Sequence, residues 1–513
     1  MSKTIKSISI VTVLLLLSKV FGFVREMFIA AYYGATWQTD AYNMALNLIS
    51  LLTAIVAAGL AAVIIPIYIQ KKVQQSDDEA RLFASNLLCI TSLFYILISI
   101  LGIIFAPQIV RLIAFNFNEE TAALTVSLMR IMFTAAVGIN IVDFLSLISR
   151  ANEKFIVPSL ISLPLTIVIV LFTVFLSGSI GIYALAYAFI VYTLIQVIIL
   201  VFSLRGVFKF SFRLNFIDGD FSNVIILSLP IFFNVAIREL NVVINRILAS
   251  GLPEGSISAI NYANVLRNLP DTIITFSLAT VIFPMLSKYA ASNDFDDFKK
   301  LAAKAVSLVF ITLLPIIAIS VHFSTDIVRL VYERGAFTYD NTIMTSHIFI
   351  FAIISIVFST GASVLTNAFY GAQDTKTPQI AMAVMVVCNI ALNLILVRYM
   401  HAAGLVFASS IAFAVFFVLL LILFRRKFGS FGGISILKNV AKYSIAAAGM
   451  IPIFLLCELL RHSLPLLIFL AIGATASLAV YAGLLYLFKA DLFMEGLKRV
   501  RTRLSRADSD DCF

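Results

Sequence analysis

Long apolar runs follow one another along nearly the whole of this sequence, separated by short polar interruptions. A helix needs about 20 mainly apolar residues to cross the ~30 Å hydrocarbon core of a bilayer, and the runs have that length. The pattern therefore predicts an all-α polytopic membrane protein of about fourteen spans. The expected spans are residues 7–31, 43–69, 83–106, 122–147, 156–177, 180–203, 222–250, 256–287, 304–324, 342–370, 377–397, 402–424, 439–458 and 464–488.

The composition supports this membrane class and narrows the function. Hydrophobic residues make up 61% of the 513 residues and charged residues 12%, whereas about 25% of an ordinary soluble domain is charged. The cysteines form no CxxC pair, and the sequence contains no GxxxxGK[ST] phosphate-binding loop. We therefore expect neither a metal centre nor a nucleotide-hydrolysing domain that would drive transport. We interpret the chain as a transporter rather than an enzyme.

Basic residues gather in alternate loops, and the net charge is +10. If the N-terminus lies in the cytoplasm, the cytoplasmic loops hold roughly five times as many Lys and Arg residues as the opposite loops. The alternation stays in phase throughout, so both termini are expected in the cytoplasm. The membrane topology explains the positive charge, and no nucleic acid partner is needed to account for it.

A short internal repeat indicates how the spans are grouped. Spans 2 and 8 share a pattern that ends in a proline, and they lie six spans apart in the same orientation. This predicts two six-helix lobes in parallel repeat, followed by two C-terminal helices. The expected divisions are 1–213 (spans 1 to 6), 214–428 (spans 7 to 12), 429–490 (spans 13 and 14) and a basic tail, 491–513. The matching residues are Ala41, Asn43, Ala45 and Pro66 in span 2, and Ala259, Asn261, Ala263 and Pro284 in span 8.

Several spans carry ionisable residues, which are costly at the centre of a bilayer and usually face a cavity or a partner. Span 1 and its counterpart in the repeat, span 7, both have a cationic face. This arrangement predicts a cavity that binds a phosphate-like anion. The alternative is that neighbouring opposite charges form structural ion pairs or reach the membrane surface. The residues are Lys19, Arg25 and Glu26 in span 1, Arg238 and Arg246 in span 7, and Arg267 in span 8.

Three further segments carry recognisable motifs. They are Ser18, Gly22, Arg25, Gly34, Ala35, Thr39, Asp40 and Ala41 near the N-terminus, Tyr332 to Thr338 (YERGAFT), and Phe369-Tyr370 followed by Asp374 to Pro378 (DTKTP). Together they resemble the motifs of the MurJ (MviN) family of lipid II flippases, which belongs to the superfamily of multidrug, oligosaccharidyl-lipid and polysaccharide exporters. The similarity extends from the first span to about the twelfth.

The resemblance implies a flippase that moves lipid II, an undecaprenyl-diphosphate-linked peptidoglycan precursor, from the inner to the outer leaflet of the bacterial cytoplasmic membrane by alternating access. It also implies a central cationic cavity and a groove for the polyprenyl tail along spans 13 and 14. The expected partners are lipid II and membrane lipids around a monomer, with no nucleic acid and no cofactor. The predicted substrate-binding residues are Lys19, Arg25, Glu26, Asp40, Arg238, Arg246 and Arg267.

The sequence departs from the family pattern at two of its arginines. Thr53 in span 2 and Val265 in span 8 stand where the family has arginine. Arg267 lies two residues from Val265, which is about 200° around a helix, so it cannot replace that arginine directly. We interpret this as a relocation of cationic charge to span 7.

Four neutral residues match the positions at which some relatives bind sodium between spans 7, 11 and 12. A hard cation needs several oxygen ligands, and an uncompensated charge in a low-dielectric interior is costly. With no carboxylate among the four, we expect weak or no binding of a monovalent cation. The residues are Asn245, Asn389, Asn393 and Ser409.

Three other functions remain open from the sequence. A flippase for a different polyprenyl-linked oligosaccharide, of a capsule or an exopolysaccharide, is favoured by the two missing arginines. A multidrug exporter would more often carry acidic residues in its cavity. A membrane-embedded glycosyltransferase would need carboxylates near a membrane surface, for which Asp40 and Glu333 are the only candidates.

Overall fold

The computed structural model describes residues 3–216, 219–461 and 463–498, and within these ranges the secondary structure is helical throughout, with no strand. A helix lies at every position where the sequence predicts a span. By length and composition, 10 of the described helices are suited to cross a membrane, or up to 11 if a bent pair counts as one span. The chain forms two compact units, Met1–Tyr262 with Arg334–Asn341, and Ala263–Glu333 with Thr342–Phe513.

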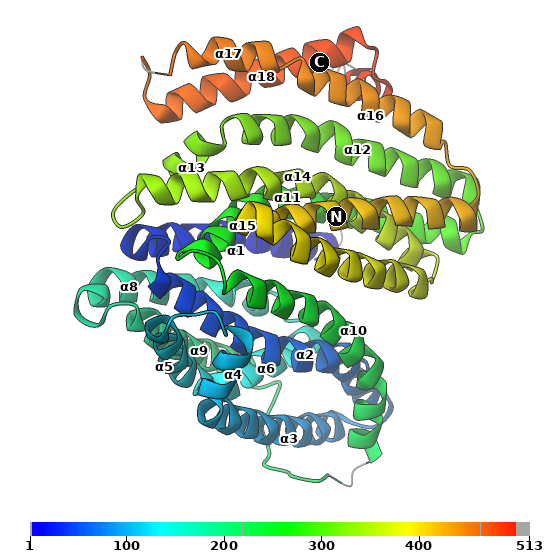
Figure 1. Ribbon diagram of the computed structural model, residues 1–513. Helices are drawn as coiled ribbons and strands as arrows, with labels where there is room; N and C mark the ends of the chain where they lie inside the picture. Colours follow the sequence, from blue (N-terminus) through cyan, green and yellow to red (C-terminus); the bar gives the residue numbers. More distant parts are fainter. Residues whose placement is uncertain (1–2, 217–218, 462, 499–513) are drawn as a thin grey trace, which may run out of the picture. The chain divides into compact units, whose positions relative to one another are not determined.

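The first unit is built around the long helix α2, which packs against α3, α5, α6 and α10. Its core is aliphatic and aromatic, with Ile64, Tyr68, Phe144 and Ile148 at most 2% exposed. The helices are α1 Lys3–Tyr33, α2 Trp37–Gln74, α3 Asp77–Ile104, α4 Ala106–Ile113, α5 Glu119–Phe133, α6 Ala136–Ala151, α7 Ile156–Leu160, α8 Ser162–Ile180, α9 Tyr183–Ser203 and α10 Gly219–Ala249 (Figure 1).

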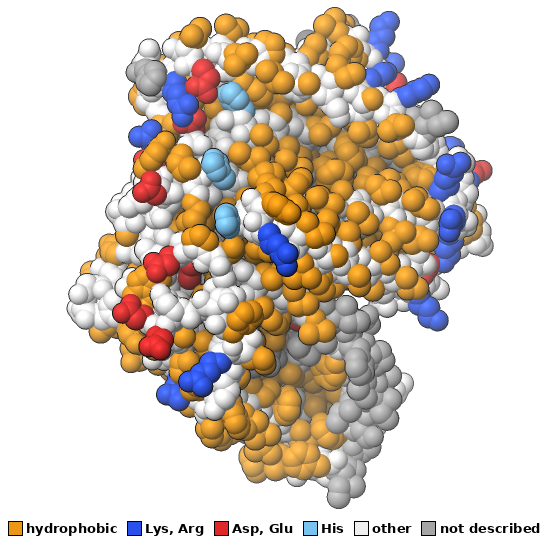
Figure 2. Space-filling view, in the orientation of Figure 1, with side chains coloured by type: hydrophobic (Ala, Val, Ile, Leu, Met, Phe, Trp, Pro, Cys, Tyr) orange, Lys and Arg blue, Asp and Glu red, His pale blue; other side chains and the backbone are white. Residues whose placement is uncertain are grey.

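The second unit begins within α11 and ends with a helical layer formed by α16, α17 and α18, which packs on α12 (Figure 1). In the space-filling view, hydrophobic side chains cover the middle of its helices, while Lys and Arg gather at one end (Figure 2). The helices are α11 Ser256–Ala291, α12 Phe295–His322, α13 Ser324–Tyr332, α14 Tyr339–Gly371, α15 Lys376–Phe428, α16 Gly433–Ala448, α17 Ile451–Glu458 and α18 Leu466–Leu487.

Span 4 is the clearest difference from the expected helices. The sequence predicts one span over 122–147, whereas the structure has two helices, α5 and α6, bent by 48°. At the bend, the Thr134 hydroxyl donates to the carbonyl of Ile131 at 2.7 Å. A threonine that bonds back to the preceding turn competes with the helical hydrogen bonds and bends the chain.

Spans 11 and 12 form the single element α15, which contains a sharp break. His401 has φ 49° and ψ −129°, a conformation outside the helical region, so two helices meet there. The break lies between the expected spans 377–397 and 402–424, which it therefore confirms. The two legs of α15 are visible in Figure 1.

Two helices that the internal repeat would relate, α6 and α14, end in the same local structure. After α6, Glu153 has φ 59°, and the N–H of Lys154 donates to the carbonyl of Ser149 at 2.9 Å. After α14, Gln373 also has φ 59°, and Asp374 N–H donates to the Phe369 carbonyl at 2.9 Å. Both are the same left-handed helix cap. This cap also follows α11, where Asn293 has φ 57° and the Asp294 N–H donates to the Tyr289 carbonyl at 2.9 Å, so it is a general helix ending in this protein rather than a mark of the repeat.

The compact units divide the chain at a different place from the repeat. The repeat places span 7 with the second lobe, but α10 packs along α2 in the first unit. The short segment Arg334–Asn341 also belongs to the first unit. Charged side chains of α1, α2, α10 and the beginning of α11 are therefore all parts of one compact body.

Candidate functional site

The charged face of α1 is partly neutralised within the protein. Arg25 donates to a Glu26 carboxylate oxygen from Nη2 at 2.6 Å and from Nε at 3.1 Å. Asn261, on the first turns of α11, donates to the other carboxylate oxygen of Glu26 at 3.3 Å. Lys19, two turns earlier, is exposed. Arg25 and Glu26 thus form the ion pair that the sequence left open, and Lys19 is an exposed cation among the described side chains of this helix.

Arg246 differs from Arg25 in its surroundings. It lies half-buried on α10, and within the described residues its guanidinium forms no ion pair with a carboxylate. The carboxylate of Asp40 is close enough to act on it electrostatically. Because a half-buried cation without an ion-pair partner is costly in a membrane span, Arg246 is the strongest candidate in this unit for binding an anion. The side chain of Arg238 lies outside the described part of the structure.

Asp40 is engaged in holding two helices together. Its carboxylate accepts hydrogen bonds from Gly255 N–H at 2.7 Å, Ser258 N–H at 2.8 Å and the Ser258 hydroxyl at 2.7 Å. These donors belong to the N-terminus of α11, where free N–H groups and the helix dipole favour a negative charge. The side chain is 4% exposed, so the structure places Asp40 as a cap of α11.

The two motifs near Gly34 and Gly335 pack against each other. Gly34 and Gly335 both have positive φ, 66° and 59°. The N–H of Ala336 donates to the carbonyl of Ala31 at 2.7 Å, and Asn341 bonds both the N–H and the carbonyl of Ala35 at 3.2 Å. A Cβ at Gly335 would meet the Ala31 carbonyl oxygen. These glycines therefore permit a contact between two distant backbone segments.

We expect Gly335→Ala to destabilise the protein by about 1–3 kcal/mol, because the new Cβ adds backbone strain and a steric clash. The measurement is the melting temperature of the purified protein together with its abundance in the membrane. Gly178→Ala is the matched control, because a Cβ at Gly178 meets nothing within 4 Å. Equal stability of both variants would show that the segment does not need this contact.

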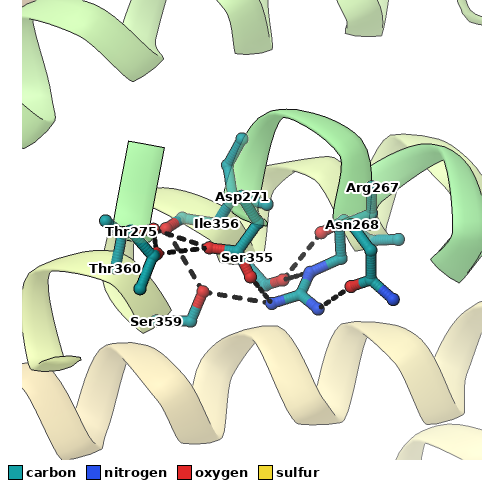
Figure 3. A network of polar contacts seen from close by, with 9 residues as sticks. Arg267, Asn268, Asp271, Thr275, Ser355, Ile356, Ser359 and Thr360 are labelled. Atoms are coloured by element: carbon teal, nitrogen blue, oxygen red, sulfur yellow. Dashed lines mark hydrogen bonds and ion pairs between the residues drawn. The ribbon is translucent and has the colours of Figure 1, made fainter. Parts of the chain in front are cut away.

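Arg267 lies in a polar network inside the second unit (Figure 3). It donates to the hydroxyls of Ser355 at 2.7 Å and Ser359 at 3.0 Å, both on α14, and lies 3.7 Å from Asp271. Asp271 in turn accepts from the Thr360 hydroxyl at 2.7 Å. The guanidinium is thus held in one orientation by α11 and α14. The α14 hydroxyls were missed by sequence reasoning, because nothing marks which of the many serines in the spans face a charge.

The asparagines of α15 form a neutral cluster that bridges its two legs. Asn393 donates to the side-chain oxygen of Asn389 at 3.0 Å, and Asn389 donates to the Ser409 hydroxyl at 3.2 Å. Asn389 and Asn393 are at most 1% exposed. The structure brings these three predicted residues together, whereas Asn245 belongs to the first unit. Within the described residues, no group of three His, Cys, Asp or Glu residues is arranged to hold a metal ion.

The DTKTP segment has a structural role at the start of α15. Asp374 accepts from the Thr377 N–H at 3.0 Å and from the Thr377 hydroxyl at 2.6 Å, and it pairs with Lys427 at 2.5 Å. Partial burial raises the pKa of this carboxyl, but the hydrogen bonds from Lys427 and Thr377 outweigh that effect and hold the pKa at about 2. Asp374 is therefore ionised at neutral pH, and it ties the start of α15 to its end.

Comparisons with known proteins agree on one family. A family model described as lipid II flippase MurJ matches residues 29–475. A probable lipid II flippase MurJ of Rickettsia prowazekii is 29% identical over 410 residues, which are 79% of this chain and 80% of the relative. The lipid II flippase MurJ of Burkholderia cenocepacia is 27% identical over 423 residues, which are 80% of this chain and 82% of that protein.

Solved structures show the same fold. A lipid II flippase MurJ in an inward closed conformation has a TM-score of 0.81 at 24% identity, covering 94% of this chain and 99% of that one. An inward-facing multidrug resistance MATE family transporter of the MOP superfamily has a TM-score of 0.70 at 13% identity, covering 81% of this chain and 95% of that one. The fold is thus common to transporters that differ in their substrates.

Proposed function

Because this chain belongs to the MurJ family of lipid II flippases, we propose that it carries lipid II from the inner to the outer leaflet of the bacterial cytoplasmic membrane. The chain is a multi-pass membrane transporter. We place both termini in the cytoplasm, since this orientation gives the cytoplasmic loops most of the Lys and Arg residues. We also propose that the protein acts as a monomer.

The observation that supports a diphosphate-bearing substrate is that the Arg246 guanidinium has no ion-pair partner among the described residues. A guanidinium presents a planar set of donors that matches the oxygens of a phosphate. Arg25 and Arg267 already bond Glu26 and Asp271, whereas Arg246 forms no ion pair within the described residues. We assign the diphosphate to Arg246, with the exposed Lys19 as a second cation of the same unit. We assign Arg25, Glu26 and Asp40 to holding that unit in shape.

The polar network around Arg267 has a different proposed role. Its guanidinium is restrained by two hydroxyls and a carboxylate, and such restraint preserves an orientation at little entropic cost. We propose that it contacts the sugar or peptide part of the substrate. Alternating access would proceed by motion of the two compact units, each of which has its own core.

The proposed substrate is tested by replacing the lipid II flippase of a depletable bacterial strain with this chain. We expect growth to be restored and lipid II to become accessible to a membrane-impermeant probe at the outer surface. The control is an equally abundant Arg246→Gln protein, which is expected to restore little growth because it lacks the proposed diphosphate-binding cation. If the cells lyse with lipid II confined to the inner leaflet, while a different polyprenyl-linked oligosaccharide is exported, the substrate assignment is wrong.

A further inference from the structure

Residues 208–216, which lie between α9 and α10, are extended, and their apolar side chains alternate with polar or basic ones. Residues 204–216 follow the end of α9 without helical structure, and aromatic side chains occupy every second position from 208 to 212 and again 216. Basic residues are interspersed, and the stretch 201–216 contains no acidic residue. The apolar members are Phe208, Phe210, Phe212, Leu214 and Phe216, and the basic members are Arg205, Lys209 and Arg213.

Hydrogen bonds fix this segment along α3. The Ser85 hydroxyl accepts from the N–H of Ser211 at 3.2 Å. Asn86 binds Asn215 twice, accepting from its N–H at 2.7 Å and donating to its carbonyl at 3.0 Å. Ser85 and Asn86 are at most 3% exposed, so the anchor points are part of the folded core. The period of two then keeps the aromatic side chains on a common side of the segment.

Two apolar cavities open beside this segment, and both lie along α3. The first has a volume of about 570 Å³ and lies between α3, α6, α9 and residues 204–214. The second has a volume of about 880 Å³ and lies between α2, α3, the beginning of α10 and Phe216. Leu93 and Ile96 of α3 line both. Each volume lies in the range of ~300–1,000 Å³ that is typical of ligand sites.

One cation lies where the first cavity meets the segment. Arg205 lines the first cavity, and its guanidinium lies 3.7 Å from the centre of the Phe202 ring. Lys209 and Arg213 are exposed on the same segment. Among the described side chains, neither cavity is lined by a carboxylate. A ligand that suits this site has two hydrocarbon chains and an anionic headgroup.

We propose that the two cavities bind the two acyl chains of one anionic glycerophospholipid, whose phosphate is held by Arg205, while Lys209 and Arg213, on the opposite side of the segment, add to the positive potential around the headgroup. The lipid joins the 204–216 segment to α3 and acts as a retained component of the first unit. It is distinct from the transported substrate, because a polyprenyl lipid has a single hydrocarbon chain. The inference goes beyond the proposed function and does not depend on which lipid is transported.

The test uses the purified full-length protein in detergent with equal amounts of phosphatidylglycerol and phosphatidylethanolamine, followed by native mass spectrometry. A juxtamembrane cation contributes about fivefold to the binding of an anionic lipid. We therefore expect Arg205→Gln to lower the retained phosphatidylglycerol about fivefold, and the triple variant with Lys209→Gln and Arg213→Gln to lower it on the order of 100-fold. Arg426→Gln, which removes an exposed cation of α15, is expected to leave retention unchanged.

A second measurement uses the thiol of Cys89, which lines the first cavity. In the wild-type protein, phosphatidylglycerol should slow the alkylation of Cys89 by a membrane-permeant maleimide, and the triple variant should lose this protection. Equal retention of the two lipids by the wild type, without protection of Cys89, would overturn the proposal. Displacement of phosphatidylglycerol by stoichiometric undecaprenyl phosphate would also overturn it, because the cavities would then belong to the substrate tail.

Discussion

Replacing Arg246 by glutamine is expected to lower lipid II translocation by roughly 10- to 150-fold without destabilising the protein. A hydrogen bond to a charged group contributes about 1.5–3 kcal/mol, which corresponds to that range of binding constants. Because Arg246 forms no ion pair within the described residues, its removal leaves no carboxylate unpaired. The melting temperature should therefore stay the same or rise, since a half-buried cation without an ion-pair partner is costly in a membrane span.

The change in stability distinguishes a binding role from a structural one. Arg25→Gln would leave Glu26 without its partner, so this variant should lower the melting temperature. Arg246→Lys should retain part of the activity, because it keeps the charge but loses the planar fork. Arg111→Gln, at an exposed position on α4, is the control for loss of an arginine. An Arg246→Gln protein that flips lipid II at the wild-type rate, or that melts well below it, would remove Arg246 from the substrate site.

Collapsing the membrane potential is expected to stop net export, whereas replacing sodium by a large inert cation is not. Each elementary charge that crosses the membrane changes its free energy by ~2.3 kcal/mol per 100 mV. A diphosphate with about two negative charges gains about 4.6 kcal/mol per 100 mV on leaving a negative interior, which corresponds to a bias of about 2,000-fold between the leaflets. Movement of the Arg246 charge with the substrate would reduce this gain.

The expected indifference to sodium follows from the asparagine cluster. Asn389 and Asn393 bond each other and Ser409, and none of the three carries a charge to compensate a cation. The experiment uses proteoliposomes with a potassium gradient and valinomycin to set the potential, with sodium or N-methylglucamine as the remaining cation. A strict sodium requirement with no effect of the potential would show that the cluster binds sodium and that the proposed driving force is wrong.

The sequence determined the spans, since they depend on local features. Apolar runs must form helices in a bilayer because no water is present to satisfy the backbone, and the break at His401 lies where two runs meet. The prediction that lipid II is the substrate came from the sequence motifs of the family. The pattern of charges in the spans would not have identified this substrate.

Only the tertiary structure decided which charges are neutralised. Arg25 and Glu26 are adjacent in the sequence, but neighbouring residues of a helix point about 100° apart. Adjacency alone therefore did not predict their ion pair, which depends on how the surrounding helices pack against both side chains. Asp40 reaches donors at 255 and 258, and Arg267 reaches hydroxyls 88 and 92 positions away. These partners come from distant parts of the chain. Helical periodicity specifies the face on which a charge lies, but the residue opposite that face is set by how the helices pack.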